Sequence, residues 1–563
     1  MQATTLFDPL RVPLSRRESW LCLSWIPEDG AEEGAFWLRN LRGGDERTDL
    51  GRLFRLQLPA DTRWTLAPGG LRAEAGGGWL AFAFADADTL AIAGQGLPLW
   101  LSLQTRHYDY AQRLDDGAVH VSCARQDLSA RVAARTGTLV LDAPWQGQRA
   151  ERIGLALQPG GDGLAASIHL YRVQPARLDV ADAAAARADA QADFDAWLAA
   201  TPPAPQQLAE LRRLAAYICW SCLVPAGGQL PYAAMYMSKN WMTNIWSWDH
   251  GFNALALGAL QPERAWQQFA LPFAHQHASG RLPDFVNDLF AYWRFTKPPI
   301  HGWVLGQLRR MAPQFWTQER LAEAHGWLAA QAGSWLATAG PDGLPRYDHG
   351  NDAGWDNATV FLQGTPLASP DLAALLVLQL DELADVAALL GRPAEPWREQ
   401  ADALAARLVE QLWTGERFVA RDAAGRAVEA GDSLIAFTPL LLGERLPAAI
   451  RERLLAGLTA PGRFWTEHGL ATEALSSPHY RDDGYWRGPI WAPTTLLFHS
   501  ALLRCGRPEL AQRLARGYTA MCARSGLAEN FDARSGAALR DPAFTWTSSV
   551  ALLLAQSLLE NGA

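Results

Sequence analysis

The pattern of apolar and polar positions divides the chain into two halves with different rhythms. From Ser19 to about Arg172, short apolar runs alternate with polar positions, and glycine-containing clusters such as 76–78 and 160–163 separate them. Alternation with a period of two is typical of half-buried strands, and closely spaced turns favour an antiparallel sandwich. We therefore predict an all-β N-terminal half, with strands within the segments 19–27, 35–41, 53–59, 78–84, 89–94, 118–124, 137–144 and 168–173.

An alanine-rich segment marks the change of rhythm. It runs through VADAAAARADAQADFDAWLAATPPAP and ends in a group of prolines around Pro203. Prolines stiffen a connection, and domain boundaries fall in such connections because few contacts cross them. We predict an N-terminal β-sandwich domain over 1–175, a helical linker over 176–205 and a second domain over 206–563.

Beyond residue 205 the apolar positions repeat at helical spacing. The clearest helix has Ser369 as N-cap and Pro370 at its first position, and it stops at Gly391. About a dozen helices in alternating pairs predict an (α/α)6 barrel, in which loops at one end build a funnel. A helical-repeat superhelix stays open as an alternative, although no repeat of fixed period is visible. The other helical runs cover 207–224, 251–273, 317–338, 396–413, 447–457, 490–504, 509–522 and 544–559.

Size and charge narrow the classes of function. With 563 residues the chain exceeds the size at which one core keeps growing, so two large domains are expected. The net charge of -9 is spread without long like-charge runs, which argues against nucleic acid and for a neutral or small polar substrate. The N-terminus has no continuous apolar region after its charges, and no run of about eighteen apolar residues follows. Neither secretion nor membrane insertion is predicted, so a cytoplasmic protein is the default.

Cysteine and histidine spacing predicts no metal or cofactor. Cys219 and Cys222 form the only CxxC among six cysteines, without a second pair or a histidine cluster, so we predict buried, reduced thiols. The histidines lack HxH or HxxxH spacing, and no nucleophile elbow, phosphate loop or dinucleotide fingerprint is present. Hydrolysis without a cofactor is the simplest remaining chemistry. The 25 tryptophans suit it, because flat rings can serve as platforms for sugar faces.

Two acidic segments in the helical half carry the candidate chemistry. The first is YDHGNDAGWDNATVF over 347–361, and the second is GLAENFDARSG around Glu529. Glycosidic cleavage needs one carboxylic acid to protonate the departing oxygen and one carboxylate to activate water or attack carbon. Asp356 and Glu529 are the candidates, and the apolar ring of Trp355 beside an acid favours its uncharged form. The alternatives are that Asp356 caps a helix starting at Ala358 and that Glu529 is an ordinary turn residue.

Several aromatic and polar motifs are predicted to line a sugar pocket. YWRGPIW gathers rings around a guanidinium, and WSWDHG places Asp249 before a helix, where capping is an equal alternative. FTKPPIHGW and RLPDFVND are weaker signals of the same kind. The predicted substrate-binding residues are Trp246, Trp248, Asp249, Lys297, Asp352, Trp355, Asn357, Tyr485, Trp486, Arg487, Trp491 and Trp546.

Taken in order, these motifs resemble glycoside hydrolase family 63, which contains processing α-glucosidase I, bacterial α-glucosidases and mannosylglycerate or glucosylglycerate hydrolases. The resemblance rests on WSWDHGFNALAL, KPPIHGW, GNDAGWDNATVF, YWRGPIW, GLAENFD and FTWTSS, and it spans about 241–549. It implies an (α/α)6 barrel, a β-sandwich in the longer members and inversion at an α-linked sugar. It also implies that Asp356 is the general acid and Glu529 the general base, and that the terminal sugar is held by Trp248, Asp249, Trp486 and Arg487.

The sequence departs from the family pattern before the acid. Many members have a Trp-Glu-Ser-Gly run there, whereas this chain has Asn-Asp-Ala-Gly over 351–354, so we expect altered leaving-group contacts at Asp352. The shortened TAGPDGLPRY segment does not imply calcium. We predict an inverting, exo-acting α-glucosidase on a small oligosaccharide or glucoside. Trehalase-like and mannosylglycerate- or glucosylglycerate-type hydrolases are alternatives on the same fold, and a polysaccharide lyase and a non-catalytic sugar-binding protein are alternatives from other classes.

Overall fold

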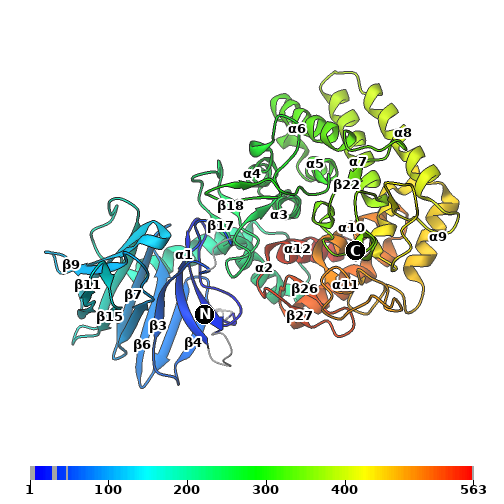
Figure 1. Cartoon of the computed structure of the whole chain (residues 1–563). Helices are drawn as coiled ribbons and strands as arrows, with labels where there is room; N and C mark the ends of the chain where they lie inside the picture. Colours follow the sequence, from blue (N-terminus) through cyan, green and yellow to red (C-terminus); the bar gives the residue numbers. More distant parts are fainter. Residues whose placement is uncertain (1–6, 28–33, 46–48, 561–563) are drawn as a thin grey trace. The chain divides into compact units, whose positions relative to one another are not determined.

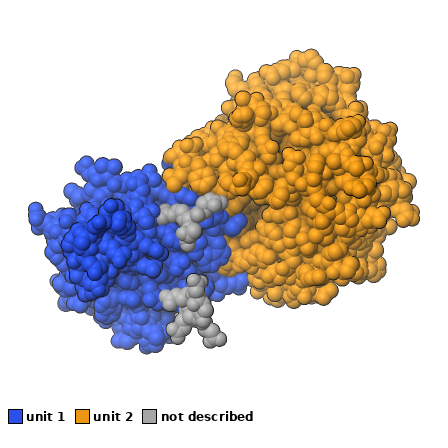
Figure 2. All heavy atoms as spheres, in the orientation of Figure 1, with its two compact units in different colours: residues 1–199, 216–227, 238–243 blue, residues 200–215, 228–237, 244–563 orange. Residues whose placement is uncertain are grey.

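The computed structural model of the chain divides into two compact units (Figures 1 and 2). It describes residues 7–27, 34–45 and 49–560. Unit 1 contains residues 1–199, 216–227 and 238–243, and unit 2 contains residues 200–215, 228–237 and 244–563. This division differs from the predicted domain limits, because the alanine-rich segment and two short later segments belong to unit 1. The predicted order of a β half followed by a helical half is confirmed.

Unit 1 is built from two antiparallel sheets. In spatial order, the first contains β1 (Leu21–Pro27), β2 (Gly34–Asn40), β3 (Arg52–Gln57), β8 (Leu99–Leu103), β15 (Ile153–Gln158) and β12 (Thr138–Asp142). The second contains β4 (Arg63–Ala67), β5 (Gly70–Ala75), β6 (Gly78–Phe84), β7 (Thr89–Gln95), β16 (Leu164–Tyr171), β11 (Leu128–Thr136), β10 (Val119–Cys123) and β9 (Tyr110–Arg113).

Every segment predicted to hold a strand contains one, and β5 shows why other strands were not predicted. In β5, Arg72 and Glu74 are half-buried, while Leu71 and Ala73 are fully buried. Buried and half-buried positions alternate in β5 as in the predicted strands. Because two of its six residues are charged, the sequence shows no apolar run there.

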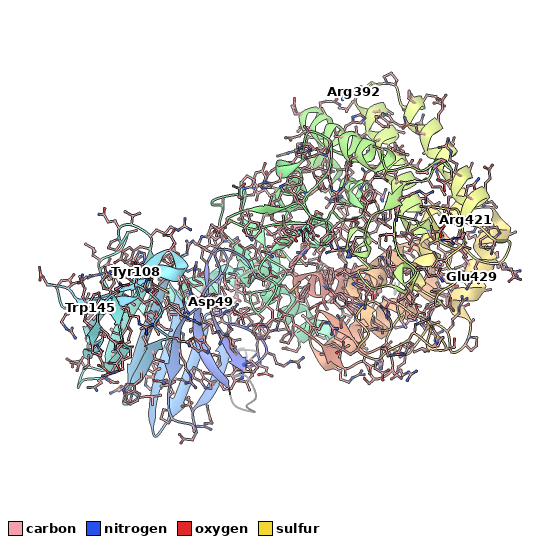
Figure 3. All side chains as sticks on the ribbon, in the orientation of Figure 1. Asp49, Tyr108, Trp145, Arg392, Arg421 and Glu429 are labelled. Carbon is pink, nitrogen blue, oxygen red and sulfur yellow. The ribbon has the colours of Figure 1, made fainter. Side chains whose placement is uncertain are left out.

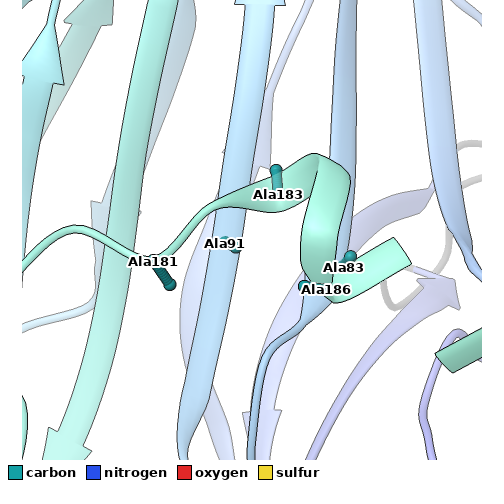
Figure 4. Packing of buried hydrophobic residues seen from close by; sticks show 5 residues of the cluster. All are labelled: Ala83, Ala91, Ala181, Ala183 and Ala186. Atoms are coloured by element: carbon teal, nitrogen blue, oxygen red, sulfur yellow. The ribbon is translucent and has the colours of Figure 1, made fainter. Parts of the chain in front are cut away.

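The alanine-rich segment packs against the second sheet. Its helix, α1 (Ala183–Ala199), contacts β6 and β7. Figure 4 shows Ala183 and Ala186 of this segment beside Ala83 and Ala91 of the strands, with Ala181 at the approach. Because alanine side chains are short, the helix can lie close to the sheet. The segment predicted as a linker is therefore part of the core of unit 1.

One edge of unit 1 carries exposed rings. The hairpin β13 (Trp145–Gln146) and β14 (Arg149–Ala150) is tied to the loop before β9, since the Ala150 amide donates to the Asp109 carbonyl at 2.8 Å. Tyr108 in that loop is 57% exposed and Trp145 is 65% exposed (Figure 3). Both rings thus lie outside the packed interior of the sheets.

Unit 2 is an (α/α)6 barrel. Its inner elements are α3 (Asp249–Leu257), α5 (His301–Met311), α7 (Pro370–Leu389), η7 (Leu434–Arg445), α10 (Ala492–Arg504) and α12 (Thr545–Glu560). Each packs against the next, and α12 packs against α3, which closes the ring. The outer helices are α4 (Pro262–Ala270), α6 (Gln318–Leu336), α8 (Glu395–Leu412), α9 (Ala448–Thr459) and α11 (Pro508–Ser525), and residues 209–215 of α2 (Ala209–Ser221) precede them in this unit. No helix among the described residues is long and apolar enough to cross a bilayer.

Three local features of the barrel differ from the sequence prediction. The predicted run 251–273 is two helices, because Pro262 starts α4 after a break at Gln261. Helix α5 was missed because its glycines interrupt the apolar period. A Cβ at Gly302 would lie 2.4 Å from the Gln379 backbone, so this glycine lets α5 approach α7 closely. Element η7 was missed because it contains a proline and a kink.

Short sheets lie at the N-terminal ends of the inner helices. Because inner and outer helices alternate along the chain, the inner ones run in the same direction, and the loops before them meet at one end of the barrel. The sheets are β19 (Ile245–Trp246), β20 (Phe285–Val286) and β21 (Ala291–Tyr292); β22 (Arg346–Tyr347), β23 (Leu367–Ala368) and β24 (Arg421–Asp422); and β25 (Ile490–Trp491), β26 (Asn530–Phe531) and β27 (Ala538–Leu539).

Candidate active site

The predicted site residues lie in the loops at this end of the barrel. Asp249 is in the first turn of α3, Lys297 precedes α5, and Asp356 precedes α7. The segment Tyr485–Arg487 precedes α10, and Glu529 precedes α12. Motifs far apart in the sequence are thus brought to the same end of one ring.

A network of tryptophans joins these motifs. The ring of Trp486 is stacked on Trp491 at 4.1 Å between centroids, and it lies 5.2 Å from Trp355 and 6.3 Å from Trp248. Trp546 meets Trp248 and Trp491 edge-on, at 6.2 and 5.5 Å. All five rings are buried. They fix the loops to one another, since each pair spans two motifs or two ends of one motif.

The loop that carries Asp356 is tightly folded. It forms the short turn η5 (Gly350–Ala353), and a Cβ at Gly350 would lie 2.0 Å from the Asp356 carbonyl oxygen. Gly354 has φ +70°, and a Cβ there would lie 2.6 Å from the Trp248 ring. Asp356 is half-buried in the following turn. The next helical turn starts after Ala358 without a side-chain cap, so the alternative that Asp356 caps it is wrong.

Asn357 clamps this loop to the Tyr485 loop. Its Nδ2 donates to the Gly484 carbonyl at 3.1 Å, and its Oδ1 accepts from the Trp486 amide at 2.9 Å. Its carbonyl accepts from Arg487 Nε at 2.7 Å. The side chain predicted to bind substrate is therefore occupied in holding two loops together.

Tyr485 adopts a left-handed backbone conformation, with φ +62°. This region costs a non-glycine residue roughly 1–2 kcal/mol. The Trp491 indole donates to the Tyr485 carbonyl at 2.9 Å, which helps to hold the strained backbone. Strain of this kind is concentrated at functional sites.

Glu473 was not predicted, and it supports the loop that carries Asp356 through a hydrogen bond with Thr359. Its carboxylate is completely buried and accepts hydrogen bonds from Thr359 Oγ1 at 2.8 Å, the Asp432 amide at 2.7 Å and Ser477 Oγ at 2.5 Å. Thr359 lies shortly after Asp356 in the sequence. The only signal in the sequence is a single acid in the otherwise uncharged run ATEALSS.

A buried charge cluster lies beside the loop that carries Asp356, which we call the acid loop. Lys297 Nζ is 3.1 Å from Asp284 Oδ1 and donates to the Asn351 carbonyl at 3.0 Å and to the Asn351 side chain. Burial lowers the pKa of Lys297, but the carboxylates of Asp356, Asp284 and Asp249 outweigh it and raise the pKa above the ordinary value. Lys297 therefore stays positively charged between these acids.

Asp249 completes this cluster. Burial raises the pKa of Asp249 to about 8, and the positive charge of Lys297 opposes this shift. Its Oδ2 is buried and has no hydrogen-bond partner among the described residues. It makes no N-cap hydrogen bond, since the N-cap position of α3 is Trp248. An orphaned buried oxygen at the mouth of a barrel is free to accept a hydrogen bond from a hydroxyl of a ligand.

Glu529 is a buried acid on the α12 side. Its amide donates to the Asp541 carbonyl at 2.8 Å, and its carbonyl accepts from Trp546 Nε1 at 3.2 Å. Burial raises the pKa of Glu529 to about 8, with Asp541 acting in the same direction and Arg540 opposing it. Its backbone is held in place, so only the carboxyl group is left for chemistry.

Several acidic side chains act on the phenol of Tyr485. Burial raises the pKa of the Tyr485 phenol well above its ordinary value. The negative charges of Asp356, Glu529 and Asp249, in that order, raise it further. The acidic side chains of three loops thus act on the protonation of the same phenol.

Asp352 does not belong to the group of acids around Tyr485. Its Oδ1 accepts from the Thr296 amide at 3.0 Å and its Oδ2 from the His349 amide at 3.1 Å. It lines a cavity whose wall includes Arg281 and Arg346 but none of the three acids around Tyr485. Trp246, in contrast, is half-buried at the edge of the site and lies 5.4 Å from Phe285.

Sequence comparisons find relatives of the helical half of the chain. Residues 242–547 match the model of the mannosylglycerate hydrolase MGH1-like glycoside hydrolase domain. A mannosylglycerate hydrolase of Rubrobacter radiotolerans is 24% identical in an alignment of length 406 that covers 54% of this chain and 89% of that protein. A glucosylglycerate hydrolase of Mycolicibacterium hassiacum is 24% identical over 409 residues, covering 55% of this chain and 91% of that protein.

Solved structures share the fold. The GH63 mannosylglycerate hydrolase from Thermus thermophilus in complex with glucose has a TM-score of 0.53 and 21% identity, and the match covers 61% of this chain and 99% of that one. A bacterial glucoamylase complexed with acarbose has a TM-score of 0.64 at 9% identity, and the match covers 99% of this chain and 95% of that one. At these identities the likeness concerns the fold alone.

Proposed function

Since the chain belongs to the mannosylglycerate hydrolase MGH1-like group within glycoside hydrolase family 63, it is a glycoside hydrolase, and we propose that it cleaves small α-linked glycosides with inversion. Asp356 protonates the departing oxygen and Glu529 deprotonates the attacking water. The observation that carries this proposal is the tryptophan network that joins the neighbours of the three acids. Trp355, next to Asp356, and Trp248, next to Asp249, both contact Trp486. Trp546 contacts Trp248 and donates to the Glu529 carbonyl.

The barrel supports inversion through the order of its inner elements. The ring runs α3, α5, α7, η7, α10, α12, so the helices that follow Asp356 and Glu529 stand three places apart, on opposite sides. An inverting enzyme needs its two carboxyl groups roughly 6.5–9.5 Å apart, with room for water between sugar and base. Acids from opposite walls of a funnel suit that arrangement better than acids from neighbouring loops.

The protonation of Glu529 sets a condition on this mechanism. A general base must be ionised, and burial raises the pKa of Glu529 to about 8. In the absence of a ligand the base therefore holds its proton through much of the neutral range. We expect catalysis to improve as pH rises toward this value.

The first candidate substrates are mannosylglycerate and glucosylglycerate. Relatives that carry these names match this chain over most of their own length. An anionic aglycone needs a cation near the acid, and Arg487 is half-buried next to Asn357. The Nε of Arg487 donates a hydrogen bond to the Asn357 carbonyl, so its two terminal nitrogens are left to bind a carboxylate.

The second candidate is an α-glucoside of a small oligosaccharide. A row of rings favours it, since Phe285 lies between Trp246 at 5.4 Å and Tyr292 at 4.9 Å, and the last two are half-buried. Flat, partly exposed rings are suited to a sugar as the leaving group. This row starts three residues before Asp249, at the edge of the site.

An NMR time course on α-mannosylglycerate, α-glucosylglycerate and α-linked gluco-disaccharides tests the proposal. We expect hydrolysis of at least one substrate with the β-anomer as first product. An initial α-anomer would contradict inversion, and no hydrolysis of any α-glycoside would contradict the proposed function.

A further inference from the structure

The cavity lined by Asp352 lies beside the loop that leads into Asp356. Its volume is about 180 Å³, whereas one water needs only about 10–15 Å³ by the same kind of measure. It is formed by the C-terminal end of α6, the strand β22 and the loops near Arg281 and Thr296. The residues that matter for its chemistry are Arg281, Trp335, Arg346, Asp348 and Asp352.

Two charged side chains of this cavity already have hydrogen-bond partners within the protein. Arg346 is buried, with one nitrogen 2.6 Å from Asp342 Oδ2 and another donating to the Asp422 carbonyl at 3.1 Å. Asp352 is 3% exposed and receives two backbone N–H groups, as described above. Both are fixed parts of the wall.

The other two charged side chains are available to a ligand. Arg281 has its nearest acidic partner, Asp352, at 3.8 Å, beyond hydrogen-bond distance, and its buried Nε has no hydrogen-bond partner among the described residues. Over the same residues, the exposed carboxylate of Asp348 makes no hydrogen bond or ion pair. A guanidinium with only a long ion pair to Asp352 and a carboxylate without a described polar partner therefore share one cavity.

We propose that this cavity is a second binding site for an uncharged polyhydroxyl compound of monosaccharide size. Two arginines and two aspartates cancel in charge, so neither an anion nor a cation is favoured overall. Neighbouring hydroxyls can donate to Asp348 and accept from Arg281. The indole of Trp335, which also lines the cavity, offers a flat apolar contact for a sugar face.

The site is coupled to the catalytic loop through Asp352. That carboxylate lines the cavity and also forms the capping box of η5, the turn that leads into Asp356. Its other partner is the Thr296 amide, beside Lys297. A ligand that draws Arg281 away from Asp352 changes the charge around a group that anchors both segments. This coupling rests on the proposed function, whereas the binding does not.

Fluorine NMR of protein labelled with 5-fluorotryptophan tests the binding at the cavity itself. The variant Trp335→Phe assigns the resonance. We expect D-glucose to shift the Trp335 resonance saturably, and Arg281→Ala and Asp348→Ala each to raise its Kd at least about tenfold. The control Arg294→Ala, an exposed arginine on a nearby loop that does not line the cavity, should bind as the native protein does.

Three outcomes would overturn the binding proposal: no saturable shift of Trp335, an unchanged Kd in both variants, or tighter binding of sodium D-glycerate than of D-glucose at this resonance. The coupling is tested on any α-glycoside that the native enzyme hydrolyses. We expect D-glucose to change kcat in the native enzyme and not in Asp348→Ala, whose kcat without glucose should match the native value. Equal responses would refute the coupling. An enzyme without activity would contradict the proposed function while leaving the NMR result decisive.

Discussion

Arg487 Nε donates a 2.7 Å hydrogen bond to the carbonyl oxygen of Asn357, the residue that follows Asp356. Together with the two bonds of the Asn357 side chain, it makes the acid loop and the Tyr485 loop one unit. The position of Asp356 is therefore set by residues more than a hundred positions later in the chain.

Asn357→Ala should lower kcat strongly and the free energy of unfolding only moderately. It removes two side-chain hydrogen bonds and leaves the Trp486 amide and the Gly484 carbonyl without partners, at a cost of about 1–3 kcal/mol. A misplacement of about 1 Å at a catalytic group can cost about 10²-fold in rate, so we expect kcat to fall by that order. Steady-state kinetics and thermal unfolding measure both effects. Gln400→Ala, an exposed amide on α8, is the control, and equal kcat values would refute the clamp.

The two candidate acids can be told apart by the leaving group. Asp356→Asn and Glu529→Gln should each lower kcat by about 10² to 10⁴-fold on natural glycosides. On an α-glycosyl fluoride, whose leaving group needs little protonation, Asp356→Asn should recover much of the native rate and Glu529→Gln should not. Recovery by Glu529→Gln alone would reverse the assignment, and full activity in both variants would remove these residues from catalysis.

The pH dependence of kcat/KM should follow the charges around Glu529. Because the base must be ionised, activity is lost as pH falls through the pKa of Glu529, which burial raises to about 8. Asp541 raises this pKa and Arg540 lowers it. We therefore expect Asp541→Asn to move the acid limb to lower pH and Arg540→Met to move it to higher pH. These acids are coupled, so the apparent values belong to the group as a whole. Shifts in the same direction in both variants would contradict this account.

Asp249→Asn should stabilise the protein while impairing catalysis. The folded-state pKa of Asp249 is about 8, above the ordinary value of about 3.9, so the folded state binds more protons than the unfolded state. Native stability then falls as pH rises from about 4 to about 8, and asparagine removes this loss. We expect the Tm difference between variant and native enzyme to grow from pH 5 to pH 8, by roughly 1 °C for each kcal/mol gained, because the entropy of unfolding scales with chain length. A constant difference would show that the charge of Asp249 is not the cause.

The sequence predicts single elements of this fold well and their assembly poorly. Helix α7 is recognisable because Ser369, Pro370 and Gly391 mark its ends. The ring is not, because Pro439 and the Gly443 kink hide η7, one of its six inner elements. The convergence of the motifs follows from a feature partly visible in the sequence, since the segments around Asp356, Tyr485 and Glu529 each precede a predicted helix. The helix after Lys297 was not predicted. Which helices are inner depends on packing between distant segments.

The same reasoning explains which site residues were found. Trp248 and Trp486 stand out because several rings gather in short polar motifs. Glu473 does not, because its partners Thr359, Asp432 and Ser477 come from three segments that meet only in the folded chain. Asn357 was found but its role differs from a simple contact with substrate, since its polar groups are used within the protein.

Glu473 provides a test of loop positioning that is independent of the site itself. Glu473→Ala removes three hydrogen bonds to a completely buried carboxylate and leaves a cavity, which should destabilise the protein by about 2–5 kcal/mol. Glu473→Gln can keep all three contacts if its oxygen accepts from Asp432 and Ser477 and its amide donates to Thr359.

If Glu473 positions the acid loop, Glu473→Ala should lower kcat about 10-fold or more at temperatures where the variant is fully folded, with little change in KM, and Glu473→Gln should restore most of it. Circular dichroism establishes the folded fraction, and steady-state kinetics separates kcat from KM. A purely structural role would lower Tm without changing kcat of the folded protein. Because Thr359 is the link to Asp356, Thr359→Val should reproduce the kinetic effect with a smaller loss of stability, and a native kcat in that variant would break the proposed connection.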